Sequence, residues 1–314
     1  CVDCHNPHYA RAGYTTGTTS SNRILGVGRI RVTNGAAGTV PTYSYVPASD
    51  PTSAPLAEYQ LCFKCHSSWT SRPAGANDLA VVFNTNNESF HPVEGAGRTT
   101  STQLQNSLAG GTGLPHLTTS STVWCSDCHA SDDLPRTVST LDDYTGAVPT
   151  GPHGSNAGAT DANFSADMLR ANYRAELTLR TVPYGSANFE FCFVCHSAAP
   201  FADMSGNTRT DTAFRFHGYH TARIINDPAG GVVGDIDVPN AGRSGEGGAV
   251  CRECHYAIHG TRQTYWSSNR TYSRLVGFSP SISGPGGAGE PSWSLSTRTC
   301  RLRSHNMNHS PETY

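Results

Sequence analysis

Five copies of the short pattern C-x-x-C-H constrain this chain more than any other feature of its sequence. They contain ten of the eleven cysteines, and every copy ends in a histidine. In a c-type haem site, two thiols add across the two vinyl groups of the haem and the adjacent histidine binds the iron. Each copy therefore fits one covalently attached haem. The cysteines are Cys1, Cys4, Cys62, Cys65, Cys125, Cys128, Cys192, Cys195, Cys251 and Cys254, and the histidines are His5, His66, His129, His196 and His255.

Three other uses of C-x-x-C pairs fit this pattern less well. Structural zinc takes such pairs two at a time, whereas this chain has five pairs, each followed at once by histidine. Disulfide bonds do not explain an odd number of cysteines and do not require the histidine. A redox-active pair occurs once in a thioredoxin-like βαβ unit, and the sequence lacks that pattern. The motifs therefore predict five haems c.

The composition indicates that something other than an apolar core organises the fold. Of 314 residues, 36% are apolar and 15% are charged, both below the globular averages. Glycine and proline contribute 32 and 19 residues, and they favour turns over long helices. We therefore predict a mostly irregular, coil-rich chain with few short helices and strands, built around a haem core. A short helix is expected at each motif, where it would bring both thiols and the imidazole to one haem face.

Charge and hydropathy exclude two classes of partner. The formal net charge is -2 and no basic run occurs, so we expect no nucleic-acid binding. The longest apolar stretch, near Leu79 to Phe83, is far shorter than the ~18 residues of a membrane span, so we expect none. Because the sequence starts at Cys1 without an export signal, we expect a processed or trimmed form.

The motifs also form an internal repeat. Their first cysteines lie 61, 63, 67 and 59 residues apart. The first, third and fifth motifs have an acidic third residue, and the second and fourth have phenylalanine after the first cysteine. Pairing the motifs gives two-haem units at residues 1–124 and 125–250 and a shortened third unit at 251–314. We expect the three units to form one continuous haem-cored domain.

Segments outside the motifs add to the pattern: FHPVEG (90–95), GPHGS (151–155), FHGYH (216–220), CRECHYAIHG (251–260) and TCRLRSHNMNH (299–309). In this order, the set resembles multihaem c-type cytochromes with doubled C-x-x-C-H units, a family abundant in metal-reducing bacteria. The resemblance spans nearly the whole chain. It implies export through the periplasm, because haem of this type is attached on the outer side of the bacterial inner membrane.

The last of these segments departs from the family pattern. Related chains have C-x-x-x-C-H there, with a further histidine four residues on, but here Ser304 stands where the second thiol belongs. Cys300 and His305 occupy the other two positions, and His309 follows. We expect a sixth haem held by one thioether from Cys300 and ligated by His305. The alternative is a vestigial site with a free thiol and two surface histidines.

An electron carrier normally has both axial positions of each iron filled, and histidines can fill them here. Eight of the fourteen histidines remain beyond the six possible proximal ones. The resemblance implies second ligands at His91, His153, His217, His220 and His259. His8 and His309 follow, because a histidine three or four residues past a proximal one points toward a neighbouring haem. His116 ranks last. With only three methionines, we expect His/His coordination and low potentials.

These expectations favour electron transfer over catalysis. A multihaem reductase of nitrite, hydroxylamine or sulfur oxyanions needs an iron with an open axial position, whereas every motif here ends in histidine. Haem sites reach from residue 1 to near residue 305, which suits head-to-tail contact in an extracellular or cell-surface filament. His8 is expected to ligate a haem of the next copy. The expected partners are copies of itself, redox-protein donors and extracellular acceptors such as metal oxides. A soluble periplasmic or outer-surface shuttle is the alternative.

Overall fold

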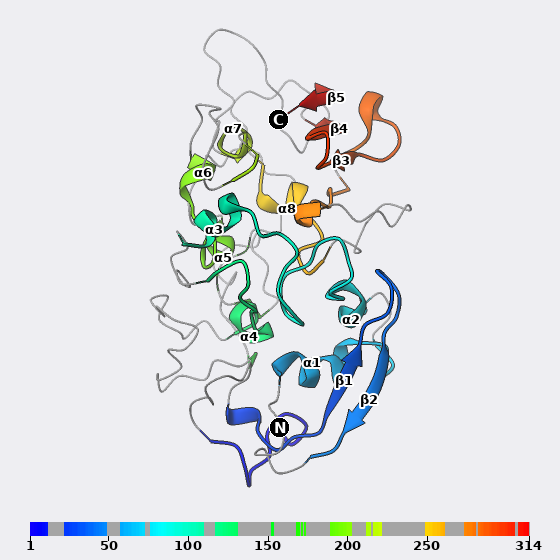
Figure 1. Ribbon diagram of the computed structural model, residues 1–314, viewed down its shortest axis with the longest axis vertical. Helices are drawn as coiled ribbons and strands as arrows, with labels where there is room; N and C mark the ends of the chain where they lie inside the picture. The colour runs from blue at the N-terminus through cyan, green and yellow to red at the C-terminus, as the bar shows by residue number, and fades with distance from the viewer. Residues whose placement is uncertain are drawn as a thin grey trace.

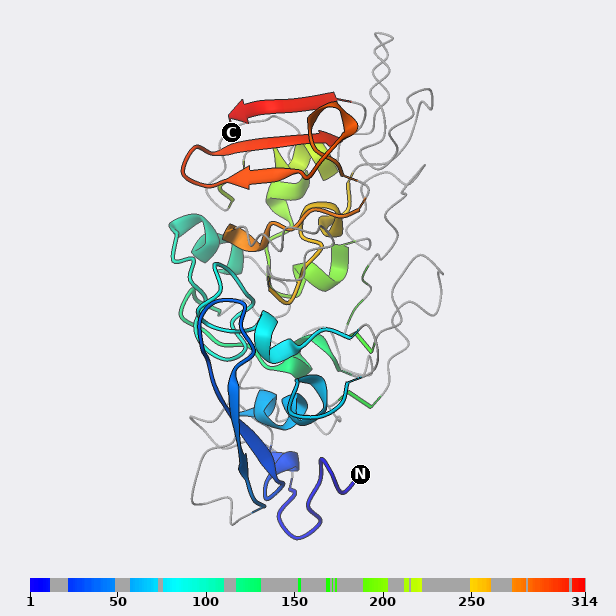
Figure 2. The ribbon, with the colours of Figure 1, turned by 90° about the vertical axis from the view of Figure 1, so that its right-hand side faces the viewer.

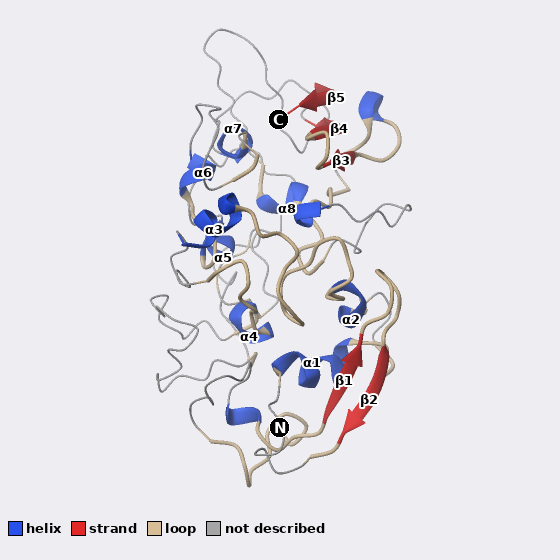
Figure 3. Cartoon of the chain, viewed as in Figure 1, coloured by secondary structure: helices blue, strands red, loops and turns tan. Residues whose placement is uncertain are grey.

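The chain is elongated and consists mainly of loops joined by short helices and strands (Figures 1 and 3). The computed structural model describes residues 1–11, 22–48, 57–72, 76–109, 117–130, 152–153, 168–169, 171, 173, 189–202, 212–214, 216–221, 249–260, 273–280, 282–304 and 307–313. The prediction of a coil-rich fold with few short helices and small sheets is confirmed. The division into three units stays a prediction.

The longest helix spans nine residues, and most span four or five. No described helix combines the length and apolar character needed to span a bilayer. The helices are α1 (Glu58–His66), α2 (Leu79–Val82), α3 (Thr102–Ala109), α4 (Cys125–Cys128), α5 (Glu190–Phe193), α6 (Ala199–Ala202), α7 (His217–Thr221) and α8 (Cys251–Cys254), with 3-10 turns at η1 (Asn22–Ile24), η3 (Ser273–Leu275) and η4 (Pro285–Gly287). The strands are β1 (Arg29–Thr33), β2 (Thr42–Val46), β3 (Ser292–Ser294), β4 (Thr299–Ser304) and β5 (Met307–Thr313).

Each C-x-x-C-H motif forms a single helical turn. The histidine N–H donates to the carbonyl of the first cysteine at 2.8 Å in the first and third motifs, 3.0 Å in the fourth and 2.9 Å in the fifth. The second motif ends α1. Residues three and four apart share one face of a helix, so the turn brings the second cysteine and the histidine to the side of the first cysteine. The expected short helix is therefore found at the second, third and fifth motifs and at the start of the fourth, whereas the first motif forms a hydrogen-bonded turn that belongs to no helix.

The acidic third residue of the odd-numbered motifs has a structural role at α4. The Trp124 N–H, just before the helix, donates to the Asp127 carboxylate at 2.7 Å. A carboxylate in the first turn satisfies a backbone donor that the helix leaves unpaired, and it suits the positive end of the helix dipole. In α8, Glu253 is fully buried and accepts a hydrogen bond from the Ser279 hydroxyl at 2.7 Å.

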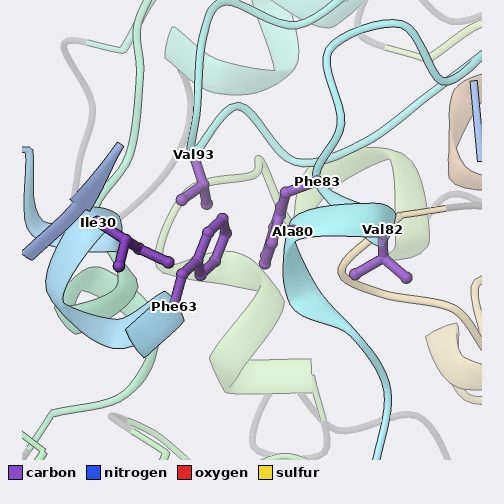
Figure 4. Close-up of a cluster of buried hydrophobic side chains, with 6 residues drawn as sticks. All are labelled: Ile30, Phe63, Ala80, Val82, Phe83 and Val93. Atoms are coloured by element: carbon purple, nitrogen blue, oxygen red, sulfur yellow. The ribbon is translucent and has the colours of Figure 1, made fainter. Parts of the chain in front are cut away.

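The phenylalanine of the even-numbered motifs fills a small aromatic cluster beside each helix. Phe63 is fully buried, and its ring centroid lies 5.3 Å from that of Tyr59 and 6.2 Å from that of Phe83. Phe193 repeats this arrangement, 5.9 Å from Phe189 and 5.5 Å from Phe201. Figure 4 shows Phe63 at the centre of the first cluster, surrounded by other apolar side chains. Burial therefore occurs in small local clusters along the chain.

Two antiparallel sheets lie toward opposite ends of the molecule (Figures 1 and 2). The hairpin of β1 and β2 pairs Arg29 with Val46 and Thr33 with Thr42, and it packs on α1. The other sheet has the order β3-β4-β5. In it Leu302 of β4 lies opposite His309 of β5, and a bulge interrupts the ladder between Cys300 and Leu302.

Candidate functional site

The motifs follow one another along the long axis of the molecule in their order in the sequence. In Figures 1 and 2 the N-terminal residues lie near one end, followed by α1, α4, α5 and α8, and the β3-β4-β5 sheet lies at the other end. Neighbouring motifs also touch. Hydrogen bonding to Cys62, together with burial, raises the pKa of the Cys125 thiol well above its ordinary value, and Cys251 does the same to Cys192. Desolvation and then the nearby Cys62 thiol raise the pKa of Cys4.

At the first motif, the proximal histidine meets one of the predicted second ligands. The Nε2 atoms of His5 and His153 face each other at 3.4 Å, and their rings are stacked with centroids 5.7 Å apart. A metal between two imidazoles, with bonds of about 2 Å, needs Nε2 atoms about 4 Å apart. The pair therefore fits an iron with a small outward movement.

The third motif has a similar pair. The rings of His129 and His259 have centroids 6.1 Å apart, and Phe83 packs edge-on against His259 at 5.3 Å. The segment carrying His259 runs beside the FHPVEG segment, because Phe90 pairs with Gly260 and the His91 N–H donates to the His259 carbonyl at 3.1 Å. A Cβ at Gly260 would overlap the Val82 carbonyl oxygen, so this close approach requires glycine.

Four further imidazoles lie near the fourth and fifth motifs: those of His91, His196, His217 and His255. Desolvation lowers the pKa of His196 to about 4, and His91 is the neighbouring imidazole that lowers it most. Desolvation likewise lowers the pKa of His217 to about 3, with His255 as its strongest imidazole neighbour. All four are therefore neutral at neutral pH, which is the form that binds a metal.

Six of the candidate ligands are held through a hydrogen bond at Nδ1. A metal-binding histidine usually donates its other ring N–H in this way, which fixes the ring and its tautomer. The partners are backbone carbonyls of Arg23 for His5 (2.9 Å), Ile258 for His91, Phe216 for His220 (2.9 Å) and Leu275 for His255 (3.0 Å), and hydroxyls of Ser107 for His196 (3.0 Å) and Thr212 for His217 (2.6 Å).

At the C-terminal sheet, His309 of β5 lies near His220 of α7, with ring centroids 6.4 Å apart. Cys300 of β4 is buried in a cluster with Phe278, Ile282 and Leu302. His305, the predicted proximal ligand of the sixth site, lies outside the described residues. His116 lies outside them as well.

Three of the predicted ligands, His8, His66 and His153, are exposed. The ring of His66 in the second motif and the ring of His8 both face solvent, and within the described residues neither ring meets another imidazole. Within the described residues, second imidazoles therefore lie near the first, third, fourth and fifth motifs but not near the second.

Sequence reasoning missed the groups that hold these elements together. Glu58 of α1 accepts hydrogen bonds from the Ser126 N–H (2.9 Å) and hydroxyl (2.8 Å) at the start of α4. Burial raises the pKa of Glu58 to about 7 despite these bonds. Ser107 and Thr212 were missed because no local pattern marks them, and the carbonyl partners could not be found because every residue has a carbonyl.

All eleven cysteines are described, and none forms a disulfide. Among the described residues, no group of three or more His, Cys, Asp or Glu side chains could hold a metal ion by itself. Haem iron needs only axial ligands from the protein, because the porphyrin supplies the rest, so pairs of imidazoles are the arrangement that a haem requires. No protein-family model, curated protein or solved structure matches this chain.

Proposed function

We propose that this protein is a multihaem c-type cytochrome that carries electrons along a line of haems. The observation that carries the proposal is the pairing of imidazoles beside C-x-x-C-H turns, above all the facing Nε2 atoms of His5 and His153. Bound haems would supply one-electron Fe(III)/Fe(II) chemistry. The thiols of each motif would hold a haem covalently, and the motif histidine would bind its iron.

The geometry supports a specific assignment of second ligands. His153 would serve the first motif and His259 the third, since their rings oppose the proximal rings. His91 would serve the fourth motif and His217 the fifth, since His91 is the imidazole that most lowers the pKa of His196, and His255 the one that most lowers the pKa of His217. A fully ligated iron has no open position for substrate, so these four sites suit electron transfer rather than catalysis.

The order of the motifs along the molecule supports transfer from one end to the other. Contact between thiols of successive motifs would bring their haems close together. The exposed His8 and His66 at the N-terminal end suit contact with another copy of the chain, whose imidazole would complete the second site. We therefore propose an extracellular or cell-surface filament that receives electrons from redox proteins and passes them to acceptors such as metal oxides.

Haem content tests the proposal directly. A pyridine haemochrome assay combined with intact mass should give at least five covalent haems per chain. Optical and EPR spectra of the assembled protein should be those of low-spin iron with two imidazole ligands. A count below five, or tightly bound zinc in place of iron, would contradict the proposal.

A second candidate function, a reductase, is favoured by one observation: the exposed ring of His66 meets no imidazole within the described residues. An iron bound only by His66 could take nitrite or hydroxylamine at its open position. We expect the assembled protein to reduce these substrates no faster than other cytochromes with two axial histidines. Fast turnover that is lost in the His66→Ala variant and kept in the His5→Ala variant would favour the reductase instead.

A further inference from the structure

The short helix α7 presents two histidines to two different parts of the molecule. His217 and His220 are three residues apart and so lie on one side of the turn. His217 couples most strongly to His255 of the fifth motif, whereas the ring of His220 lies 6.4 Å from that of His309 in β5. One turn of helix can therefore supply ligands to two neighbouring irons.

The His220 and His309 rings are spaced like the other imidazole pairs. Their centroid distance of 6.4 Å compares with 5.7 Å for the pair at the first motif and 6.1 Å for the pair at the third. Imidazoles on opposite sides of one metal, with bonds of about 2 Å, have ring centroids about 6 Å apart. His220 also donates from Nδ1 to the Phe216 carbonyl at 2.9 Å, which fixes the ring and its tautomer as in a metal-binding histidine.

The terminal sheet places a thiol on the same face as His309. Cys300 and Leu302 are buried, and Arg301 between them is exposed, so Cys300 and Leu302 share the inward face of β4. His309 lies opposite Leu302, and residues opposite each other in a ladder project to the same face. Cys300 and His309 are therefore diagonal neighbours on the inward face, about 7–8 Å apart. A helical C-x-x-C-H turn separates its first cysteine from its histidine by a rise of about 6 Å.

We propose that Cys300, His220 and His309 form a sixth haem site, in which His309 and not His305 is the axial ligand from the terminal sheet. This inference rests on the proposed function. Cys300 would make a single thioether: its sulfur bonds to one carbon of a haem vinyl group and its hydrogen passes to the other carbon, so no oxidant is needed. Ser304 cannot make a second thioether because it has no thiol.

The sequence contains an indication of this site, but it lies far from Cys300 along the chain. The FHGYH segment has a second histidine that the corresponding FHPVEG segment lacks. That additional histidine is His220. In this site the pairing of β4 and β5 brings the cysteine and the histidine to one face, as the helical turn does in the other motifs.

Single and double variants of the full, haem-loaded chain test the site by intact mass and EPR. The wild type should carry six haems, and Cys300→Ala should retain five under denaturing conditions. His309→Ala and His220→Ala should each convert one haem to high spin. The double variant should also affect only one haem, because both rings serve the same iron. His305→Ala is the matched control and should leave every haem low-spin.

The outcomes separate this inference from the proposed function. Five covalent haems in the wild type, or a high-spin haem in His305→Ala but not in His309→Ala, would overturn the sixth site and leave electron transfer standing. Two high-spin haems in the double variant would place His220 and His309 on different irons and overturn it too. Fewer than five haems would contradict the proposed function itself. If His309→Ala fails to fold, His309→Met should keep six low-spin haems and raise one potential, since methionine ligation raises haem potentials; unchanged potentials would count against the site.

Discussion

Hydrogen bonds at Nδ1 connect the candidate ligand residues to the rest of the chain. Where the partner is a carbonyl, as Phe216 is for His220, no side-chain substitution removes it. His196 and His217 instead depend on the hydroxyls of Ser107 and Thr212. These two positions allow the hydrogen bond to be changed without touching the ligand.

The first residue-scale prediction concerns Ser107, which is buried in α3 beside His196. An imidazole bound to iron through Nε2 has its proton on Nδ1, so it donates to the Ser107 hydroxyl. Donation makes the ligand more basic and stabilises ferric iron. Ser107→Ala should therefore raise the potential of one haem by about 20–60 mV, the equivalent of one hydrogen bond for one electron.

Spectroelectrochemical titration would measure this shift. Ser296→Ala, at an exposed serine in the turn between β3 and β4, is the control and should leave all potentials unchanged. A lower potential in Ser107→Ala, or an equal shift in both variants, would contradict the role of this hydrogen bond.

At this scale the sequence identifies candidate proximal ligands by a local pattern but does not pair them with candidate second ligands. A proximal histidine follows its cysteine directly, so a local pattern identifies it. The partner of His5 is His153, which is 148 residues away, and His91 is held by a carbonyl 167 residues away. No spacing rule links such positions, so the sequence could supply a set of candidate histidines but not their pairing.

At the scale of elements, buried polar contacts join the short helices and strands. Glu58 links α1 to α4, and Glu94, after the FHPVEG histidine, links that loop to the end of β1 through Asn34. The Asn34 side-chain amide donates to Glu94 Oε2 at 2.8 Å. Within the described residues, Glu94 Oε1 and Asn34 Oδ1 are buried without hydrogen-bond partners. Both contacts lie beside the apolar cluster around Phe63, which includes Ile30 of β1 and Val93 of the loop.

The pH dependence of stability should report on Glu94. Desolvation raises its pKa from 4.5 to about 7. A carboxyl whose pKa is raised by folding stabilises the fold below its unfolded pKa, and this stability is lost as the pH rises through the folded pKa. The contribution of Glu94 to stability should therefore fall between about pH 5 and pH 8, with Glu58 contributing in the same direction.

Glu94→Gln should remove part of this loss and stabilise the protein by about 2 kcal/mol at pH 8. The neutral amide has no charge to desolvate, and its NH₂ can donate to Asn34 Oδ1. Thermal unfolding across pH 5 to pH 8 would measure the effect, with the exposed Glu88→Gln as control. If the stability of the variant and of the wild type depends on pH in the same way, ionised Glu94 is not destabilised by desolvation, and the prediction is contradicted.

Element types were predictable where a local cause decides them. Glycine, proline and polar residues favour loops, and the motif spacing favours one helical turn, and both predictions were confirmed. The three-stranded sheet was not predicted. Its strand β4 contains the buried residues Cys300 and Leu302. The cysteine and the histidines of this segment had suggested another haem-attachment turn. Pairing with β3 and β5 decides its structure instead.

For the whole molecule, the elongated form follows from local packing. Apolar burial occurs in separate clusters around Phe63, Phe193 and Phe278, each beside one or two motifs. Such a chain does not need a single central core, and successive motifs can extend along one axis (Figure 1). The composition predicts the shortage of apolar core, but the direction in which the units extend depends on contacts far apart in sequence.

Removal of His8 should test assembly of the whole molecule. If His8 completes the second site of a neighbouring copy, His8→Ala should keep at least five covalent haems, show one high-spin haem and form no filaments by electron microscopy. His116→Ala is the control. Normal filaments and a fully low-spin spectrum for His8→Ala, or a high-spin haem in His116→Ala alone, would show that the missing ligand lies elsewhere.

Because paired imidazoles lie far apart in the sequence, one member of each pair is synthesised well before the other. The chain leaves the ribosome from its N-terminal end, so His129 emerges well before His259, and His5 long before His153. If haems are attached to the growing chain, as the proposed function would require, His5 and His129 would each hold an iron before its second imidazole is present. Carbon monoxide or cyanide present at that stage should then lower the yield of haem-loaded protein at concentrations that leave the finished protein unchanged.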